Sequence, residues 1–385
     1  MAETLDQLGD LPLSTGPFIL SEWVRGSHMV LLPNRDYYRS EAGYPRLERL
    51  RFRFFRLNDD MVAPVLAGEC LVDLEDEIDP LHMPYYREAE ENGLLSRHIA
   101  LGDTYQNLNF GINPVPDYET ARAYDWFDDK RVRQALTMCL DRQRLAEQAA
   151  YGETDYIVNY VSQAHPFFDL ALNRWPYNPA AGRELLREAG FADGNRDGVI
   201  EGPNDVPFVI SLQMTPEPEW AYESLARLIV EGFADCGVTT TVEQRPTSEL
   251  YALGPDAPLA GRQFDLGITQ LPTGIDPPCQ WYLTASIPGN PNDGFAFGWR
   301  GANVGGWSDP NFDAACERAQ AAFYGSEAYE SAHREALAIF AEEMPTVPLF
   351  PELRVALTSP EVANLRLDST QPSPLWNLFE IGWKE

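Results

Sequence analysis

Short apolar runs separated by turn residues dominate the first part of the chain. The runs GPFILSEWV and HMVLLP flank the turn Arg25-Gly26-Ser27 and predict a hairpin within Gly16–Pro33. Alternation of apolar and polar residues over Leu47–Phe55 predicts another strand. Further strands are expected at 71–74, 94–101 and 104–112, and short helices at 58–66 and 80–89. These mixed elements with short connections indicate an α/β unit.

The stretch Tyr105–Arg144 changes character along its length. It begins as an alternating strand, passes through a Pro-containing loop and then opens two helices. Asp128 or Asp129 is expected to cap the first helix and Asp141 the second, because a carboxylate accepts hydrogen bonds from the free N–H groups at a helix start. A strand that leaves one compact unit and feeds a helix of another is typical of a domain crossing. We therefore expect a hinge here and a two-lobed protein.

The middle of the chain alternates between strand and helix patterns. Asn178-Pro179 through Gly190 carries a complete helix signature, with Asn at the N-cap, Pro at the first position and Gly just past the end. Strands are expected at 207–214, 238–244 and 264–270, and helices at 179–189, 219–236, 247–253, 309–322 and 327–343. Because strands and helices alternate here, a largely parallel sheet is predicted.

Residues 272–304 lack a clear period and are rich in Pro, Gly, Asn and Trp. Long irregular segments inside compact domains are often functional. The Trp and Tyr residues that cluster around this region are Trp281, Tyr282, Trp299 and, just beyond it, Trp307. Rings on loops can stack on sugars or close over peptide side chains, although packing in the core is the simpler explanation for at least half of them.

Charge and length narrow the class of protein. With 385 residues the chain is long enough for two or three domains. Its 59 acidic and 29 basic residues give a formal net charge of −30. This balance argues against nucleic acids and anionic membranes as partners, since both require clustered Lys and Arg. No apolar run approaches the roughly 18–20 residues needed to cross a bilayer.

The chain start and the cysteines leave the cellular compartment open. The opening MAETLDQLGDLPLS has neither a basic nor an apolar segment, so no export signal is visible. The protein is then either cytoplasmic, or exported by a signal upstream of this sequence. The cysteines are widely scattered, and Cys139, Cys236 and Cys316 each fall in a helical apolar pattern. We expect these three to be small buried thiols rather than ligands or nucleophiles.

Motifs of catalysis are missing from the sequence. There is no GxSxG, HExxH, GxxxxGK[ST] or GxGxxG, and the five histidines show no metal-ligand spacing. Acidic residues are so abundant that pairing any two as acid and base would be arbitrary. The sequence therefore predicts that the protein is not an enzyme and requires no cofactor.

One stretch follows the start of a calcium-binding loop. Asp193-Gly-Asn-Arg-Asp-Gly-Val-Ile-Glu201 places oxygen donors at alternate positions and a Gly at the sharp turn. The bidentate Glu expected at the twelfth position is replaced by Asn204, with Asp205 next to it. A turn without metal fits equally well. If calcium binds, we expect a structural role for ligands Asp193, Asn195, Asp197, Val199, Glu201 and Asp205.

Several stretches, in order along the chain, resemble family 5 of the extracytoplasmic solute-binding proteins of ABC importers, the oligopeptide, dipeptide and nickel type. The matching stretches are Ser14–Phe18 with Glu22-Trp23, Asn34–Tyr38, Ala67–Glu69 before Val72-Asp73, Phe127–Leu136 leading to Asp141-Arg142, Tyr177–Phe191, Gly306–Asp313 and Pro345–Phe350. The resemblance runs from about Leu11 to the C-terminus, and so many ordered signatures make chance similarity improbable.

The resemblance implies an α/β, two-lobed fold of the type II periplasmic-binding-protein kind. Lobe I would be residues 1–110 completed by 350–385, and lobe II residues 111–349, with hinge crossings near 105–113 and 346–351. Family members carry an export signal, a first strand and a small subdomain before the matched region. We therefore expect an incomplete lobe I here, poor stability in isolation, and an extracytoplasmic, lipoprotein-like location for the full-length bacterial protein.

The resemblance also implies a function and a ligand site. The protein would be the receptor of an ABC importer, delivering a small solute to permease subunits; the alternative is a fragment without its own ligand. In peptide-binding relatives an Asp shortly before a pair such as Asp276-Pro277 holds the peptide amino group, but Thr273 stands there. A peptide, an oligosaccharide or another neutral solute therefore fits. The expected ligand-binding residues are Gln106, Asn107, Asn109, Thr273, Asp276, Gln280, Trp281, Tyr282 and Asn303.

Overall fold

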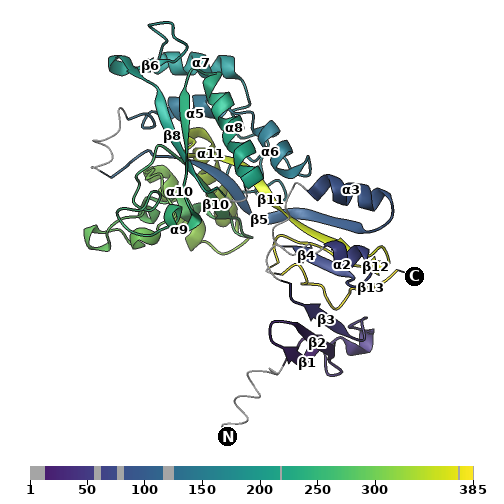
Figure 1. Ribbon diagram of the computed structural model, residues 1–385. Helices are drawn as coiled ribbons and strands as arrows, with labels where there is room; N and C mark the ends of the chain where they lie inside the picture. Colours follow the sequence, from purple (N-terminus) through teal and green to yellow (C-terminus); the bar gives the residue numbers. More distant parts are fainter. Residues whose placement is uncertain are drawn as a thin grey trace. The chain divides into compact units, whose positions relative to one another are not determined.

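The computed structural model describes residues 14–55, 62–75, 82–115, 125–216, 219–371 and 373–384. Contacts between residues divide the chain into two units. Unit 1 comprises Met1–Ala100 and Leu353–Glu385, and unit 2 comprises Leu101–Glu352. The chain therefore passes between the units twice, within strand β5 (Ser96–Phe110) and within strand β11 (Thr346–Thr358) (Figure 1).

Unit 1 begins with a three-stranded antiparallel sheet in the order β1 (Phe18–Val24), β2 (His28–Pro33) and β3 (Leu50–Arg53). The predicted hairpin is confirmed, with Val24 opposite His28 and the Ser27 amide donating to the Val24 carbonyl. The other elements of unit 1 are α2 (Val62–Leu66), β4 (Val72–Glu75), α3 (Met83–Glu91), β12 (Val362–Ala363) and β13 (Gly382–Trp383), with a short turn of 3-10 helix, η1, at Ser40–Ala42. The cap expected at Asn58–Asp60 lies outside the described residues.

Strand β5 runs unbroken where the sequence predicts two strands. Gly102, which lies between the two predicted strands, is in extended backbone beside β11. A Cβ at this position would come 3.0 Å from the Glu352 carbonyl oxygen. Gly is therefore needed here so that the two crossing strands can approach closely, and it does not mark a turn.

The sheet of unit 2 has the order β11, β5, β10 (Leu266–Pro272), β8 (Val209–Met214) and β9 (Thr239–Gln244). Strands β8, β9 and β10 are parallel, as the alternation of strands and helices predicts, whereas β5 is antiparallel to β10. The short strands β6 (Glu201–Gly202) and β7 (Val206–Pro207) pair separately, joined by the 3-10 helix η3 (Pro203–Asp205).

The helices of unit 2 begin at the predicted caps. Asp129 accepts a hydrogen bond from the Arg131 amide at 2.8 Å, Asp141 caps the next helix, and Asn178 caps the third. The helices are α5 (Lys130–Cys139), α6 (Arg142–Ala150), α7 (Pro179–Glu188), α8 (Glu219–Ala234), α9 (Thr247–Leu250), α10 (Pro310–Ala321) and α11 (Glu327–Glu343). None of the helices within the described ranges combines the length and hydropathy of a membrane-spanning segment.

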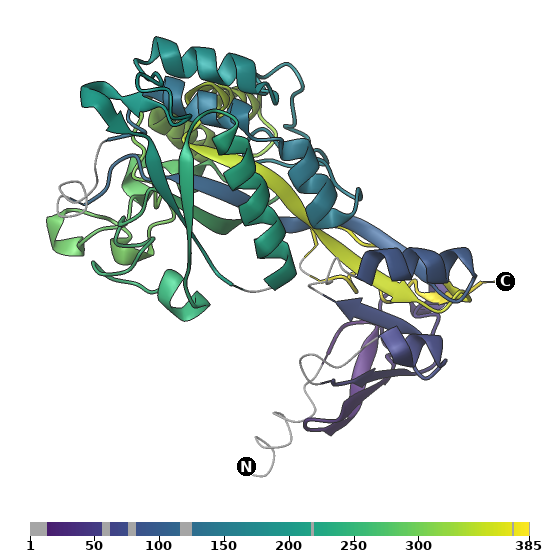
Figure 2. The same ribbon diagram turned by 45° about the horizontal axis from the view of Figure 1, so that its top comes forward.

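Two separate cores cover the two faces of this sheet. On β5, Leu108 and Phe110 face a core shared with α5 and α8, whereas Tyr105 faces a second core shared with α10 and α11. Helix α8 runs alongside β8 and β9 in both views (Figures 1 and 2). Residues 272–304 form no long element but a series of 3-10 turns, at Cys279–Tyr282, Thr284–Ser286, Pro291–Asp293 and Gly298–Arg300.

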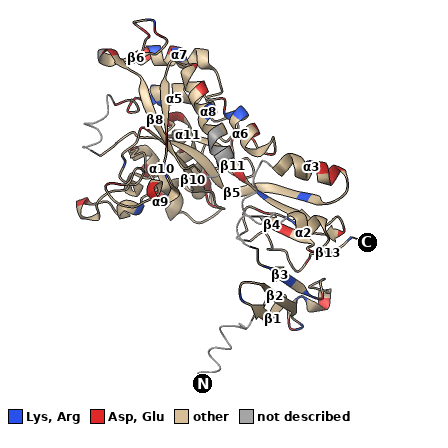
Figure 3. Cartoon of the chain, viewed as in Figure 1, with Lys and Arg blue, Asp and Glu red and all other residues tan. Residues whose placement is uncertain are grey.

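Positively and negatively charged residues are interspersed along the helices and strands, as the colours of Figure 3 show. Most ion pairs are exposed and local, such as Arg187 with Glu184 on α7 and Arg245 with Glu249 on α9. Arg133 is different because it is buried. Its guanidinium donates to the carbonyls of Phe127, Glu343 and Met344, and so ties α5 to the end of α11.

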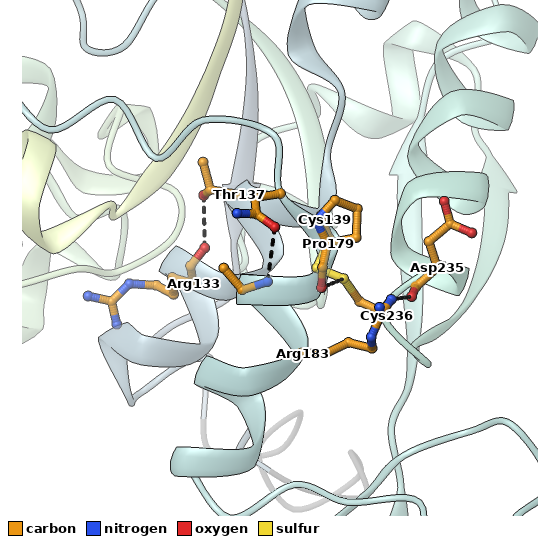
Figure 4. The surroundings of a disulfide bond; sticks show 9 residues. Arg133, Thr137, Cys139, Pro179, Arg183, Asp235 and Cys236 are labelled. Carbon is orange, nitrogen blue, oxygen red and sulfur yellow. Dashed lines mark hydrogen bonds between the residues drawn. A yellow bond between two sulfur atoms is a disulfide. The ribbon is translucent and has the colours of Figure 1, made fainter.

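The cysteines correct one expectation. Cys139, Cys236 and Cys316 are buried, as predicted, but they are not thiols: Cys139 bonds to Cys236, and Cys279 bonds to Cys316. Figure 4 shows the first disulfide, which joins Cys139 at the end of α5 to Cys236, two residues after the end of α8. The helical pattern places each cysteine in the core, but partners 97 and 37 residues apart leave no signal in the sequence.

Candidate functional site

The carboxyl ends of parallel strands are where ligands bind in open α/β sheets. In unit 2 this edge is formed by the ends of β8, β9 and β10. The last residues of β10 pair with the start of the unit 2 part of β5, with Gln270 opposite Gln106 and Pro272 opposite Thr104. The Thr273 amide then donates to the Asp103 carbonyl at 2.6 Å. The predicted residues near 106 and 273 are thus brought to one edge.

The three predicted residues on β5 do not share a face. Asn107 and Asn109 are 0% and 2% exposed and form a buried network. The Asn107 amide donates to Asn109 at 3.0 Å, and the Asn109 amide donates to the Thr269 hydroxyl at 2.8 Å. Buried amides of this kind fix neighbouring strands to one another. In this conformation the two asparagines therefore hold the sheet together from within.

Gln106 lies on the opposite face, beside a carboxylate that the sequence analysis missed. The Glu352 carboxylate on β11 accepts hydrogen bonds from the side chains of Gln106 at 3.0 Å, Gln270 at 2.5 Å and Thr104 at 2.5 Å. The sequence does carry a signal for this residue, since Glu352 is the one charged residue between Pro345 and Leu353, in a stretch that is mostly apolar. A charge at such a position requires a specific role.

Asp276 follows β10 in the irregular segment, and its carboxylate is exposed. It accepts a hydrogen bond from the Tyr329 hydroxyl at 2.5 Å. Burial of the phenol, strengthened by this bond to Asp276, raises the pKa of Tyr329. This contact connects the irregular segment to α11.

The remaining predicted residues are mostly anchors of the irregular segment. Asn303 is buried, and its amide donates to the carbonyls of Tyr282, Leu283 and Trp307. Tyr282 is buried too, with its hydroxyl 2.5 Å from the Tyr105 hydroxyl. Gln280 and Trp281 are half-buried next to them. The segment is therefore held rigidly from inside unit 2.

Two histidines lie next to Asp276. His165 shares a hydrogen bond with the Ile275 carbonyl at 3.0 Å, and the buried His333 packs 4.5 Å from the ring of Tyr329. Burial lowers the pKa of both imidazoles, an effect that the Asp276 charge partly offsets. Both rings are therefore held toward the neutral form.

The calcium-like loop closes on itself through its own side chains. Carboxylate oxygens of Asp193, Asp197 and Glu201 lie within 4.8 Å of one another. The Asn195 amide nitrogen donates to Asp197 at 3.0 Å and to Glu201 at 2.7 Å, in the position where a cation would draw them together. The Val199 amide donates to Asp197 at 2.9 Å. Asp205 lies in η3 and is not part of this group.

A hollow of about 420 Å³ lies near α9 and contains none of the predicted residues. Its lining includes Arg245, Glu249, Leu253, Pro255, Asp256 and Gln263. The Arg245 guanidinium is bound by Glu249 at 2.5 Å and by Glu243 at 3.1 Å. The hydrogen bond to Glu249 is the main cause that raises the pKa of Arg245. The cation is thus already neutralised by the chain itself.

Comparison with known proteins places these features in a family. The sequence profile of the bacterial extracellular solute-binding proteins, family 5 Middle, matches residues 2–293. Di/tripeptide-binding protein 3 of Pseudomonas aeruginosa is 25% identical over 357 residues, which cover 89% of this chain and 57% of that protein. Oligopeptide-binding protein AppA of Bacillus subtilis is 28% identical over 198 residues, covering 49% of this chain and 32% of that protein.

Solved structures agree on the fold. HbpA2 from Haemophilus parasuis has a TM-score of 0.74 at 17% identity, covering 100% of this chain and 69% of that one. NikA from Brucella suis, in complex with Fe(III)-EDTA, has a TM-score of 0.71 at 19% identity, covering 97% and 69%. The predicted type II periplasmic-binding-protein fold is confirmed.

The chain spans 57% of the length of the P. aeruginosa relative, so the match covers part of that protein. The family match itself extends over most of this chain, and the ordered stretches from Ser14 to Phe350 carry the same resemblance. The chain belongs to family 5 of the bacterial extracellular solute-binding proteins.

Proposed function

We propose that this chain is the receptor of an ABC importer, which captures a small solute and delivers it to the permease subunits without catalysis. The family match carries the proposal, because the matched profile covers residues 2–293, which include strands β5, β8, β9 and β10 and most of the irregular segment. The two strands that cross between the units support it. A hinge at β5 and β11 would require backbone changes at only two places.

A peptide is the solute class that we favour. The relatives are named dipeptide-, di/tripeptide-, oligopeptide- and glutathione-binding proteins. An oligosaccharide, which the neutral residues Thr273 and Gln280 would also suit, has no comparable support. No feature of the described ranges favours the alternative of a fragment without a ligand.

An extracytoplasmic location follows for the family, and the two disulfides support it for this chain. Disulfides persist in oxidising compartments and are rare in the cytosol. Of the two locations that the sequence left open, the bonds Cys139–Cys236 and Cys279–Cys316 favour export. Attachment as a lipoprotein remains part of the proposal.

The receptor function is tested by ligand binding. Native mass spectrometry of the purified chain should show a co-purified solute. Thermal unfolding with panels of di- to pentapeptides and of oligosaccharides should show a shift for peptides. A ligand at 100 times its Kd stabilises by about 2.7 kcal/mol, so the shift is easily measured. If no member of either panel binds, the receptor proposal is wrong.

We also propose a test for structural calcium. If the loop takes up the ion, about 1 mM Ca²⁺ added after chelation should raise the Tm, as expected for a ligand that binds only the folded state. The variant Asp193→Asn should lose this rise. An unchanged Tm in the wild-type protein would mean that the loop is held by hydrogen bonds from the Asn195 amide and not by an ion. The calcium prediction would then be wrong.

A further inference from the structure

The donors that reach the Glu352 carboxylate from the described residues are all neutral. Thr104, Gln106 and Gln270 each donate one hydrogen bond to it. No Lys, Arg or His of the described ranges forms an ion pair with it. Within the part of the chain that the structure describes, the charge of Glu352 is therefore not balanced by a cation. Other charges of the chain are paired: Arg131, Arg187 and Arg245, for example, each form an ion pair with a carboxylate.

The hydrogen-bonding capacity around Glu352 is unevenly filled. An ionised carboxylate offers about four acceptor positions. From the described residues, Oε1 accepts hydrogen bonds from Gln106 and Gln270, whereas Oε2 accepts one from Thr104. Beside it, Gln106 is only 7% exposed, and its buried Oε1 accepts no hydrogen bond from the described residues. The group thus presents free acceptors and lacks donors, and an unpaired buried acceptor costs roughly 1–3 kcal/mol.

The position of the group suits contact with a solute. Gln270 is exposed and Glu352 is partly exposed, so the group can be reached from solvent. It lies at the carboxyl end of β10, which is the edge where ligands bind in sheets of this kind. A purely structural tie between β5, β10 and β11 would need only a neutral hydrogen-bonding side chain, because a charge taken from water is costly unless it is paired.

We propose that Glu352 is the residue that selects for a cationic nitrogen of the solute, either a primary ammonium or a guanidinium. This inference rests on the proposed receptor function. The cation donates to Oε2 of Glu352, which supplies the charge and a donor that the described surroundings of the carboxylate lack. For a peptide the cation is the free α-amino group or a basic side chain. Glu352, on the second crossing strand β11, thus provides a carboxylate in place of the one that position 273 lacks, where the sequence has Thr273.

Matched probes on the full chain test the inference by calorimetry. The first pair is trialanine and N-acetyl-trialanine; the second is an N-acetylated, amidated Ala-Arg-Ala and its citrulline analogue. In each pair the members differ chiefly by one cationic charge. A charge-assisted hydrogen bond is worth about 1.5–3 kcal/mol, so the cationic member of at least one pair should bind about 10- to 100-fold more tightly.

Variants separate the charge from the fold. In Glu352→Gln the preference should fall to within about threefold, because the amide keeps the shape and Thr104 can turn its hydroxyl to accept from it. Glu352→Asp keeps the charge and should keep the direction of the preference, even if the Gln variant is unstable. The control Glu317→Gln removes one exposed charge on α10 and should behave as the wild-type protein.

The outcomes are distinct. Equal binding of charged and neutral members by the wild-type protein, or a preference that survives in Glu352→Gln, overturns the inference while the receptor function stands. Failure of every member of both pairs to bind also overturns it. Failure of the wider peptide and oligosaccharide panels as well removes the receptor proposal itself.

Discussion

His333 on α11 shows how one buried residue can make the stability of the fold depend on pH. It is 2% exposed and packs against the rings of Tyr329 and Phe167 at 4.5 and 5.4 Å. The groups that face it include the Asp276 carboxylate, which favours its charged form, and His165, which disfavours it. Burial is the dominant effect, and it lowers the pKa of His333 below its ordinary value of 6.5.

The direction of the pH dependence follows from this shift. Below pH 6.5 the unfolded chain binds a proton at this histidine before the folded chain does, so the free energy of unfolding falls as the pH falls. We expect His333→Phe to lose stability less steeply than the wild-type protein between pH 7 and pH 5 in denaturant titrations. The slopes are compared, so a constant loss from repacking cancels. Equal slopes for the two proteins would contradict the prediction; His82→Gln, at an exposed site, is the control.

At this scale the sequence predicts helix caps well, whereas the partners of buried polar side chains depend on long-range pairing. Asp129, Asp141 and Asn178 all accept from the expected amides, because capping depends only on local spacing. Asn107 and Asn109 look like site residues in the sequence, but long-range pairing with Thr269 buries them. Glu352 went unnoticed for the same reason, since its partners lie on β5 and β10.

At the scale of elements, the Cys139–Cys236 disulfide joins the end of α5 to the residues just after α8. A link between residues 97 apart restricts the unfolded chain strongly. The loop-entropy relation gives about 4–5 kcal/mol for a loop of this length, as an upper estimate that depends on the entropic model. Helix α7 packs closely against this disulfide, because a Cβ on Gly182 of α7 would lie 2.8 Å from the Cys139 sulfur.

We therefore expect the double substitution Cys139→Ala with Cys236→Ala to lower the free energy of unfolding by several kcal/mol. The pair Cys279→Ala with Cys316→Ala should cost less, since its loop is 37 residues, and the same relation gives about 4 kcal/mol. Denaturant titrations of both variants under oxidising conditions make the comparison. A first pair no more costly than the second would argue against loop entropy as the main term.

Most element types, though not their partners, follow from the sequence. The helices α7, α10 and α11 and the strands β8, β9 and β10 lie where periodicity places them, within a few residues. The parallel order of β8, β9 and β10 also follows, because each connection contains a helix. The joining of two predicted strands into β5 does not follow from the sequence, because it depends on the close approach of Gly102 to Glu352, which is a tertiary contact.

At the scale of the whole molecule, charge is the dominant property. A net charge of −30 means that acidic groups repel one another throughout the folded chain. Raising NaCl from about 10 mM to about 150 mM shortens the screening length from about 30 Å to about 8 Å. We expect the Tm to rise over this range, and we expect no binding to oligonucleotides. A Tm that is constant or falls with salt would show that local ion pairs outweigh the repulsion.

The division into two units was also expected from the sequence, and the crossings of β5 and β11 lie near the predicted hinges. The predicted lobe boundaries at 110 and 350 stay predictions, because the hinge itself is defined by motion. What the sequence could not supply is the identity of the solute, which depends on side chains gathered from several strands.

Cys70 has a practical consequence that follows from the pairing of the other four cysteines. It is the free cysteine of the chain and lies partly exposed in unit 1, with its sulfur 3.7 Å from the Arg53 guanidinium. A maleimide dye should therefore attach to the native protein at one defined place, with no engineered cysteine. A second dye at an introduced cysteine in unit 2 would then report by energy transfer whether a solute changes the distance between the units.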